Sequence, residues 1–193
     1  MRYIAGLFIL FTVFFSCHSP EPTYIITSNG DTAVKADKDE IPDTSRSLEH
    51  IYSIETGNTT PEELISFANS LKGIPYKYGS IDPKEGFDCS GFVTYVFNHF
   101  NIKVPRTSFD FSFVHRPIEL KDAKPGDLIL FTGTDSLERT VGHMGIILSP
   151  QGQPVTFIHS TSGKAYGVTE TPLNSYYMGR YMHTIRIFPQ NDK

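Results

Sequence analysis

The spacing of apolar residues changes once along this chain, and that change restricts the fold more than any other feature. Between residues 61 and 100 apolar residues recur every three or four positions, which predicts helices. Between residues 127 and 188 they gather in short runs bounded by turn residues, which predicts strands. The expected strands are 127–131, 141–148, 155–160 and 181–188. Helices followed by an antiparallel meander favour an α+β domain over a doubly wound parallel sheet.

The first expected helix has sequence signals at both ends. Thr60 can cap it while Glu63 reaches back, and Pro61 suits the first helical position. Gly73 is placed to end it. One face would carry the apolar residues Leu64, Ile65, Ala68 and Leu71. The folded domain is therefore expected to begin at about residue 60 and to extend to residue 189.

Length, charge and cysteine content exclude several classes of protein. The chain has 193 residues, enough for one ordinary domain with an appendage. Its net charge of -4 argues against a nucleic-acid-binding protein. Only two cysteines occur, Cys17 and Cys89, which excludes a disulfide framework and a four-cysteine zinc module. We expect no metal, no cofactor and a monomer.

The N-terminus has the pattern of an export signal. A basic start at Arg2 precedes an apolar run from Tyr3 to Phe15, which is too short for a comfortable membrane span. The run ends at Ser16-Cys17, which resembles the lipobox of bacterial lipoproteins, where the cysteine is acylated. The alternative is an ordinary export signal with a chance cysteine. Residues 1–17 are therefore predicted to be a lipoprotein signal peptide, and lipidation of Cys17 would anchor the chain in the cell envelope.

A polar, turn-rich segment follows and is expected to act as a tether over residues 18–59. Pro20, Pro22 and Pro42 and a charged stretch lie within it. Residues 24–34, around Asn29-Gly30, are compatible with a small hairpin.

The second cysteine stands at a position that favours chemistry. Cys89 begins the second expected helix, which runs to about Phe100. Unpaired backbone N–H groups at a helix N-terminus stabilise an anion, so the thiol there is expected to gain thiolate character. The alternative is a purely structural role, in which Cys89 is a small buried residue that packs the start of the helix. An unpaired thiol in an exported protein makes that alternative less attractive.

Two histidines lie on neighbouring expected strands. If 141–148 and 155–160 pair as a hairpin with His143 opposite His159, both side chains share one face. Glycines at 142 and 145 leave space beside His143. One histidine could then act as a base toward Cys89 while the other orients it. Two other interpretations remain, namely two satisfied core histidines or a zinc site formed by Cys89, His143 and His159.

Six short blocks together resemble the NlpC family of bacterial cell-wall cysteine peptidases, over about residues 61–188. The blocks are Tyr76–Gly79, Asp88–Val93, Val104–Ser108, Lys124–Leu128, Gly142–Ile146 and Ile158–Ser160. Each block is common alone, but the ordered series is specific. The resemblance implies a minimal papain-like fold with N-terminal helices packed on an antiparallel sheet. It also implies cleavage of peptidoglycan stem peptides, typically between D-glutamate and the diamino acid.

The resemblance also implies roles for single residues. Cys89 matches the nucleophile, His143 the general base, and His159 the polar residue that orients the base. Tyr76 matches a tyrosine whose hydroxyl helps bind the oxyanion. The positions expected to bind substrate are Asp88, Ser90 and Arg106.

The chain departs from the family pattern at two places that shape the cleft. Ser80 stands where a second glycine is frequent, and Phe109–Phe111 where a glutamine is frequent. These departures leave the accepted stem peptide open. Two rival functions also remain, a papain-like amidase or acyltransferase on another substrate and a non-catalytic lipoprotein that binds stem peptides.

Overall fold

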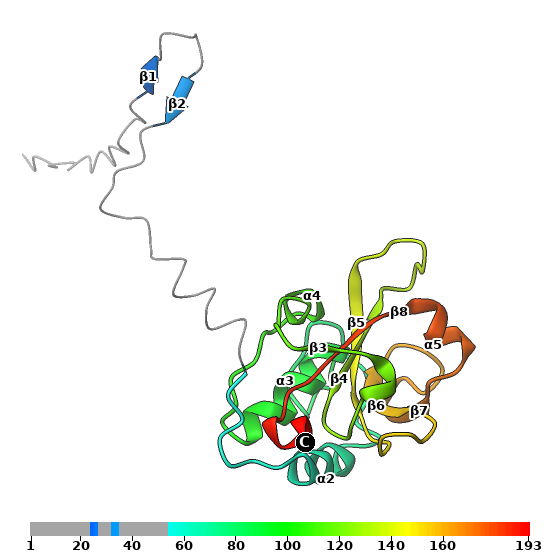
Figure 1. Cartoon of the computed structure of the whole chain (residues 1–193). Coiled ribbons are helices and arrows are strands. Elements are labelled where there is room, and N and C mark those ends of the chain that lie inside the picture. The colour runs from blue at the N-terminus through cyan, green and yellow to red at the C-terminus, as the bar shows by residue number, and fades with distance from the viewer. Residues whose placement is uncertain (1–23, 27–31, 35–53) are drawn as a thin grey trace, which may run out of the picture. The chain divides into compact units, whose positions relative to one another are not determined.

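The computed structural model describes residues 24–26, 32–34 and 54–193 (Figure 1). The chain divides into two units, residues 1–42 and 43–193. In the first unit β1 (Tyr24–Ile26) and β2 (Thr32–Val34) pair antiparallel, so the strands of the expected hairpin are present. The expected signal peptide, Cys17 and most of the expected tether lie outside the described residues.

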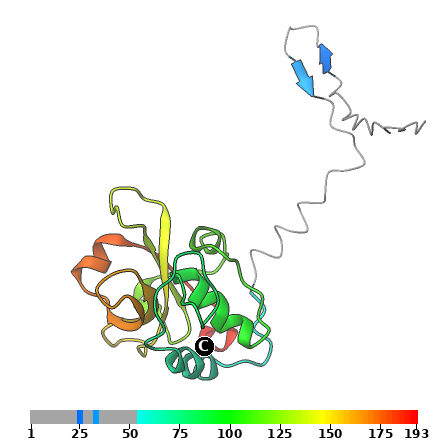
Figure 2. The same ribbon diagram turned by 180° about the vertical axis from the view of Figure 1, so that it is seen from behind.

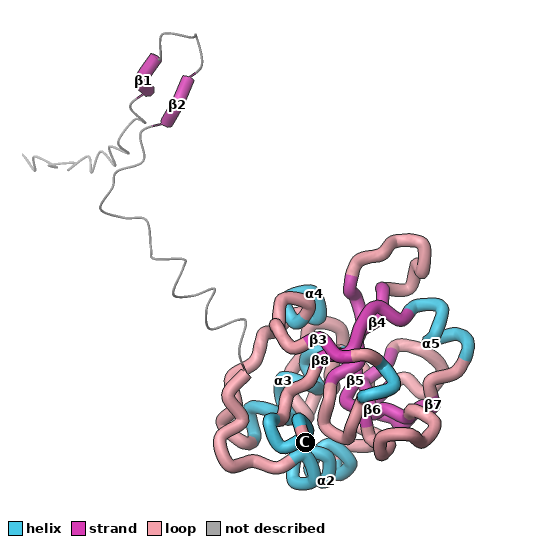
Figure 3. Tube along the Cα trace, in the orientation of Figure 1, coloured by secondary structure: helices cyan, strands magenta, loops and turns pink. Residues whose placement is uncertain are grey.

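The second unit is an α+β domain, as the sequence predicts. Its helices are α2 (Pro61–Ser70), α3 (Cys89–His99), α4 (Ser108–Phe111) and α5 (Ser175–Arg180), with short 3-10 turns at Leu120–Asp122 and Pro189–Asp192. Its strands are β3 (Pro117–Ile118), β4 (Leu128–Thr132), β5 (Val141–Ile147), β6 (Thr156–Thr161), β7 (Gly167–Pro172) and β8 (Tyr181–Ile185). The strands form one antiparallel sheet in the order β3-β8-β4-β5-β6-β7 (Figures 2 and 3).

The two main helices begin where their capping residues predict. Thr60 accepts from the backbone N–H of Glu63, and the Glu63 carboxylate accepts from the backbone N–H of Thr60. Asp88 caps α3 by accepting from the backbone N–H of Gly91 at 2.5 Å. Cys89 is therefore fixed as the first residue of α3.

The sheet is buried on both faces at β4, because successive side chains of a strand point to opposite sides. Leu128 and Leu130 join a core that includes Phe92 and Phe97 of α3. Ile129 and Phe131 join a second apolar cluster that includes Tyr177 of α5. Helix α3 thus packs on one face of the sheet and α5 contributes to the other.

The pairing of β5 with β6 differs from the expected register. Ile146 faces Ile158 and Ile147 faces Phe157, so the ladder places Gly145, and not His143, opposite His159. The displacement is by two residues, which preserves the face of every side chain. The prediction that His143 faces His159 directly is therefore wrong, although the shared face was correct.

Several elements were not expected from the sequence. Strand β7 pairs with β6 along its whole length, from Thr156 opposite Pro172 to Thr161 opposite Gly167. The short α5 lies between β7 and β8. The expected meander is also incomplete, since β8 returns to lie between β3 and β4.

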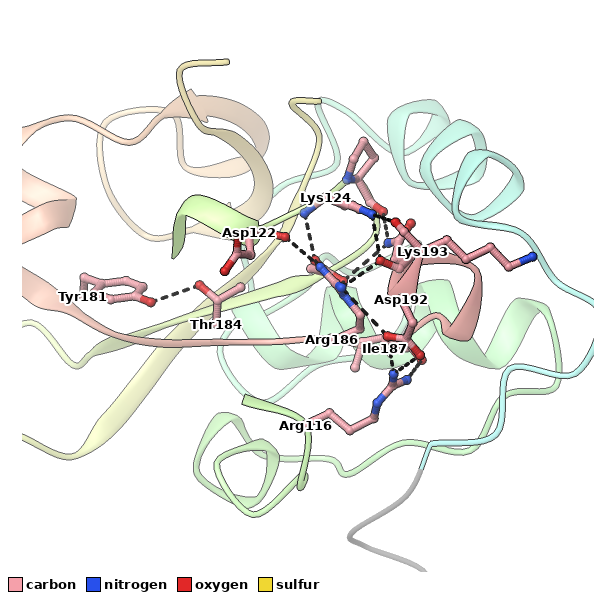
Figure 4. A network of polar contacts seen from close by, with 12 residues as sticks. Arg116, Asp122, Lys124, Tyr181, Thr184, Arg186, Ile187, Asp192 and Lys193 are labelled. Atoms are coloured by element: carbon pink, nitrogen blue, oxygen red, sulfur yellow. Dashed lines mark hydrogen bonds and ion pairs between the residues drawn. The ribbon is translucent and has the colours of Figure 1, made fainter. Parts of the chain in front are cut away.

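A cluster of polar contacts closes the C-terminal end of the domain against the Lys124–Asp127 turn (Figure 4). The buried carboxylate of Asp127 accepts from the backbone N–H of Lys124 and pairs with Arg186 at 3.3 Å. Arg186 also donates to the backbone carbonyls of Asp122 and Asn191, each at 2.7 Å. The Pro-Gly-Asp block of the sequence therefore forms part of the framework.

No helix among the described residues is both long and apolar enough to cross a membrane.

Candidate active site

Cys89 lies in a cleft of about 1080 Å³. Tyr76 and His143 also line it, so three of the residues expected to act in catalysis meet in one cavity. The Cys89 thiol donates to the carbonyl of Gly142, with Sγ to O at 3.9 Å, which joins the start of α3 to β5. Helix α3 packs directly on β5 and β6, the strands that carry the two histidines.

A chain of hydrogen bonds crosses three strands behind Cys89. Nε2 of His143 on β5 lies 2.8 Å from Nδ1 of His159 on β6. Nε2 of His159 lies 3.0 Å from the hydroxyl of Thr171 on β7. His159 is fully buried and His143 is 9% exposed, so both rings are held by their surroundings. His143 has one ring nitrogen, Nε2, committed to this chain, whereas both ring nitrogens of His159 are committed to it.

The shifted register explains how the rings meet. His143 and His159 are diagonal neighbours, at a separation that long or ring-bearing side chains can bridge. Gly145, directly opposite His159, leaves the space through which they meet. A Cβ at Gly145 would lie 2.7 Å from the Phe157 ring, 2.9 Å from the Ile158 carbonyl and 3.2 Å from the Cβ of His159.

A second buried contact fixes β6 relative to Cys89. The hydroxyl of Ser160, fully buried, donates to the backbone carbonyl of Phe87 at 2.7 Å. Phe87 lies two residues before the nucleophile candidate, and its N–H donates to the carbonyl of Pro75. Ser160 therefore joins the strand that carries His159 to the segment that leads into Cys89.

The electrostatics of the site correct one sequence-based expectation. Burial, and then the negative charge of Asp88, raise the pKa of Cys89 to about 11. Backbone N–H groups at the start of α3 oppose this shift, as expected for a helix N-terminus, but they do not outweigh it. The gain of thiolate character expected for Cys89 is therefore not found, because burial first, and the charge of the helix-capping Asp88 second, favour the neutral thiol.

Burial acts on the two histidines in the opposite sense. It lowers the pKa of His143 well below its usual value, and the neighbouring His159 and Arg180 lower it further. Burial and Arg180 lower the pKa of His159 to about 4. A neutral thiol therefore faces neutral imidazoles near pH 7, and an acceptor for the thiol proton is available in the same cleft.

Tyr76 lines the cleft beside Cys89. Its N–H donates to the carbonyl of Tyr166, and its backbone forms a bridge with Phe87. Burial, and then Cys89, raise the pKa of the Tyr76 phenol. The phenol therefore remains protonated and can donate a hydrogen bond.

The three residues expected to bind substrate bind one another. Arg106 donates to Asp88 at 2.8 and 3.2 Å and to the hydroxyl of Ser90 at 3.0 Å. Asp88 also accepts from Ser90 at 3.3 Å. None of the three belongs to the residues that line the large cleft in the described part of the chain. Their assignment to substrate binding stays a prediction.

The zinc alternative does not match the geometry. Within residues 54–193, no three His, Cys, Asp or Glu side chains are grouped so that they could hold a metal ion. A ring nitrogen of His143 and one of His159 are hydrogen-bonded to each other at 2.8 Å. These two nitrogens therefore cannot both bind one zinc ion.

Sequence reasoning missed Thr171 and Arg180. Thr171 lies in the segment Gly167–Pro172, which is rich in β-branched residues (Val168, Thr169 and Thr171), and this composition favours a strand. Arg180 follows Tyr176 and Tyr177, an aromatic pair that indicates packing rather than a loop. Both residues line the cleft.

A family model and several known proteins match this chain. The model of the NlpC/P60 family matches residues 73–187. This chain belongs to that family. It is 34% identical over 134 residues to a protein of Bacillus subtilis named gamma-DL-glutamyl hydrolase, a match that covers 69% of this chain and 32% of the relative. A protein of Escherichia coli named murein DD-endopeptidase MepS/murein LD-carboxypeptidase is 28% identical, with 62% and 59% covered.

Solved structures of the family have the same fold. A family member from Bacillus cereus superposes with a TM-score of 0.61 at 27% identity, covering 70% of this chain and 42% of that chain. The NlpC/P60 domain of the peptidoglycan hydrolase SagA gives 0.54 at 25% identity, covering 67% of this chain and all of that chain. The chain spans about a third of the length of the first curated relatives that it matches.

Proposed function

We propose that this protein is a cysteine endopeptidase that hydrolyses peptide bonds in peptidoglycan stem peptides, at the bond between D-glutamate and the diamino acid. The observation that carries the proposal is the hydrogen-bonded chain from His143 to His159 and Thr171, which ends in the cleft that holds Cys89. Membership of the family, and relatives named as glutamyl hydrolases and murein endopeptidases, support the substrate class.

In this mechanism Sγ of Cys89 attacks the scissile carbonyl while its proton passes to Nδ1 of His143. Tyr76 and backbone N–H groups at the start of α3 stabilise the oxyanion. The C–N bond breaks, and His143 gives its proton to the leaving amine. Water then attacks the thioester while His143 takes the water proton and returns it to Sγ.

The hydrogen-bonded chain fixes which nitrogen of His143 can act. For Nδ1 to accept a proton, Nε2 must carry the hydrogen, and it donates to Nδ1 of His159. His159 then carries its own hydrogen on Nε2 and donates to Thr171. Because burial keeps both imidazoles neutral, the base is available well below neutral pH.

Before substrate reacts, the Cys89 thiol and the His143 imidazole are both neutral, and this determines the step at which catalysis lowers the barrier. With the pKa of Cys89 near 11, little free thiolate exists at pH 7. Proton transfer to His143 must therefore accompany attack, when the donors around the oxyanion balance the developing charge. Asp88, which opposes the free thiolate, stays compensated by Arg106.

Two further parts of the proposal concern residues beyond this cleft. Asp88, Ser90 and Arg106 form a network of one ion pair and one hydroxyl next to Cys89 that we assign to substrate binding. Acylation of Cys17 would anchor the monomeric chain to a membrane of the bacterial envelope, with the domain facing the periplasm or the cell surface. The sequence pattern supports this anchor.

The test is digestion of purified peptidoglycan of known composition, with the released fragments identified by mass spectrometry. The proposal predicts fragments with a new D-glutamate carboxyl terminus and a new amino terminus on the diamino acid. Cleavage at a different stem-peptide bond would replace the proposed bond. Turnover of simple amides or esters without release from peptidoglycan would favour an amidase or acyltransferase on another substrate.

A second readout separates an enzyme from a non-catalytic binding protein. A thiol-directed peptide electrophile should label Cys89 in the wild-type protein and fail to label Cys89→Ala. The His143→Gln variant should be labelled more slowly, because proton transfer from the buried thiol then lacks its acceptor. Equal labelling rates with and without His143 would contradict its role as base.

A further inference from the structure

We infer that Arg180 binds a carboxylate of the substrate on the leaving-group side of the scissile bond. This inference deepens the proposed function, on which it rests, by assigning the chemistry of one subsite. Arg180 is the last residue of α5, lines the cleft and is 8% exposed.

The guanidinium of Arg180 is buried without an anion from the described part of the chain. Its hydrogen bonds go to the hydroxyl of Tyr176 at 2.7 Å and the backbone carbonyl of Thr132 at 2.9 Å, both neutral acceptors. Its Nε is buried and has no hydrogen-bond partner in the described part of the chain. No carboxylate among the described residues forms an ion pair with it. A buried cation normally has such a partner, so an external anion is the missing one.

The charge of the cleft agrees with an anionic ligand. Of the residues that line it, those with ionised side chains are Lys164 and Arg180, and both are cations. No Asp or Glu lies among these lining residues, although the whole chain has 21 acidic against 17 basic residues. A concave surface that carries one sign of charge attracts ligands of the opposite sign.

The position of Arg180 selects the side of the scissile bond. The guanidinium carbon lies 5.8 Å from the centre of the Tyr177 ring, and that ring stacks on His143 with centroids 6.2 Å apart. The Tyr177 ring therefore lies next to both Arg180 and the proposed general acid. His143 protonates the leaving nitrogen, so substituents of that nitrogen extend toward His143. In a stem peptide that ends at the diamino acid, the free C-terminal carboxylate lies on the carbon bonded to this nitrogen, so the ligand inferred for Arg180 is a tripeptide stem.

The geometry of a guanidinium suits this ligand. Arg180 has five N–H donors, of which the two bonds to Tyr176 and Thr132 occupy only part. The planar group can hold a carboxylate through two parallel bonds, which lysine cannot reproduce. The Tyr176 ring, 56% exposed, lies under the cation at 5.0 Å and would form the outer wall of the subsite.

The experiment measures binding in the Cys89→Ala variant, so that hydrolysis plays no part. The probes are the tripeptide L-Ala-γ-D-Glu-L-Lys as the free acid and the same peptide as its C-terminal carboxamide. The acid should bind about 10- to 100-fold more tightly than the amide. Adding Arg180→Gln should remove this preference by weakening the acid alone, and Arg180→Lys should retain part of it.

A matched control is Arg139→Gln. Arg139 is exposed and donates to backbone carbonyls of Gly179 and Tyr181 on either side of Arg180, but it does not line the cleft. Its removal should leave the preference for the acid unchanged. Equal binding of acid and amide, no binding of either, or a preference that survives in Arg180→Gln would overturn the inference. Digestion of peptidoglycan by the wild-type protein is a separate readout, so the proposed function stands or falls independently.

Discussion

Two buried arginines flank β8, and their surroundings differ in one respect. Arg186, directly after the strand, is 9% exposed and pairs with the fully buried Asp127. Arg180, directly before the strand, is 8% exposed and meets only neutral acceptors. The charge of Arg186 is paired with a carboxylate of the protein. The charge of Arg180 has no such partner among the described residues, and its side chain lines the cleft. The difference separates a region that holds the fold together from one that lines the cleft of Cys89.

The same contrast holds for the residues around each arginine. At the C-terminal cluster (Figure 4), Lys124 donates to the Asp127 carboxylate and to the carbonyl of Asn191, and Asp192 pairs with two arginines, Arg116 and Arg186. In the cleft, the half-buried Cys89 and the buried His143 are neutral groups whose chemistry needs a further reactant. Substitutions in the cleft should therefore change activity more than stability, and substitutions in the cluster should do the reverse.

After substitution of Cys89 itself, the largest expected effect on activity comes from substitution of the general base, His143. His143→Gln should lower kcat/KM by about 10²- to 10⁴-fold, since general acid–base catalysis contributes that much. His159→Asn should cost less, because it orients the base without exchanging protons with substrate. Steady-state rates on a stem peptide measure both. Equal losses in the two variants would contradict the assignment of roles.

The largest expected effect on stability comes from the cluster. Asp127→Ala removes the buried ion-pair partner of Arg186 and leaves it with the more distant, exposed Asp192 at 3.8 Å, so it should lower the free energy of unfolding by about 3–5 kcal/mol. The Asp192 side chain is 48% exposed and pairs with Arg116. Asp192→Ala should therefore cost only about 0–1 kcal/mol of stability. Urea unfolding measures the two values. A similar small cost for both would mean that burial does not distinguish these pairs.

A third substitution tests the link between β5 and β6. Gly145→Ala places a methyl group against the Ile158 carbonyl and the Phe157 ring, and it should cost about 1–3 kcal/mol through overpacking. It should also reduce activity, because His159 must move away from His143. Gly179→Ala in α5 is the control, since its Cβ would meet nothing within 4 Å. Unchanged activity in Gly145→Ala would show that the two rings meet without this space.

A further expected effect is a difference in pH dependence. Burial lowers the pKa of His159 to about 4 in the folded protein from 6.5, so the unfolded chain binds more protons between these values. The stabilising contribution is complete above pH 6.5 and is lost as pH falls toward 4. Burial instead raises the pKa of Asp127, which has the opposite sign and favours the folded state on acidification.

The two signs can be separated by mutation. Between pH 8 and pH 4 the wild-type protein should lose more stability than His159→Asn does, because the variant lacks one of the groups that protonate on unfolding. Denaturant midpoints at each pH provide the comparison. Parallel curves for the two proteins would show that His159 does not contribute to acid destabilisation.

Local patterns predicted much of this fold, and long-range packing accounts for the rest. Thr60 and Asp88 mark their helices because a cap acts within one turn. The register of β5 with β6 could not be fixed from sequence, because a shift of two residues leaves every side chain on its face. Thr171 and Arg180 were missed because they are far from Cys89 in sequence and reach it through β7 and α5.

The proposed endopeptidase activity depends most directly on the thiol of Cys89. Cys89→Ala removes one sulfur atom from the first turn of α3 and leaves the Asp88 cap, the histidine pair and Arg180 in place. The decisive measurement is release of stem-peptide fragments from purified peptidoglycan by this variant, with circular dichroism to confirm the fold. The account predicts a folded protein that releases no fragments. Release at the wild-type rate from folded Cys89→Ala would contradict it.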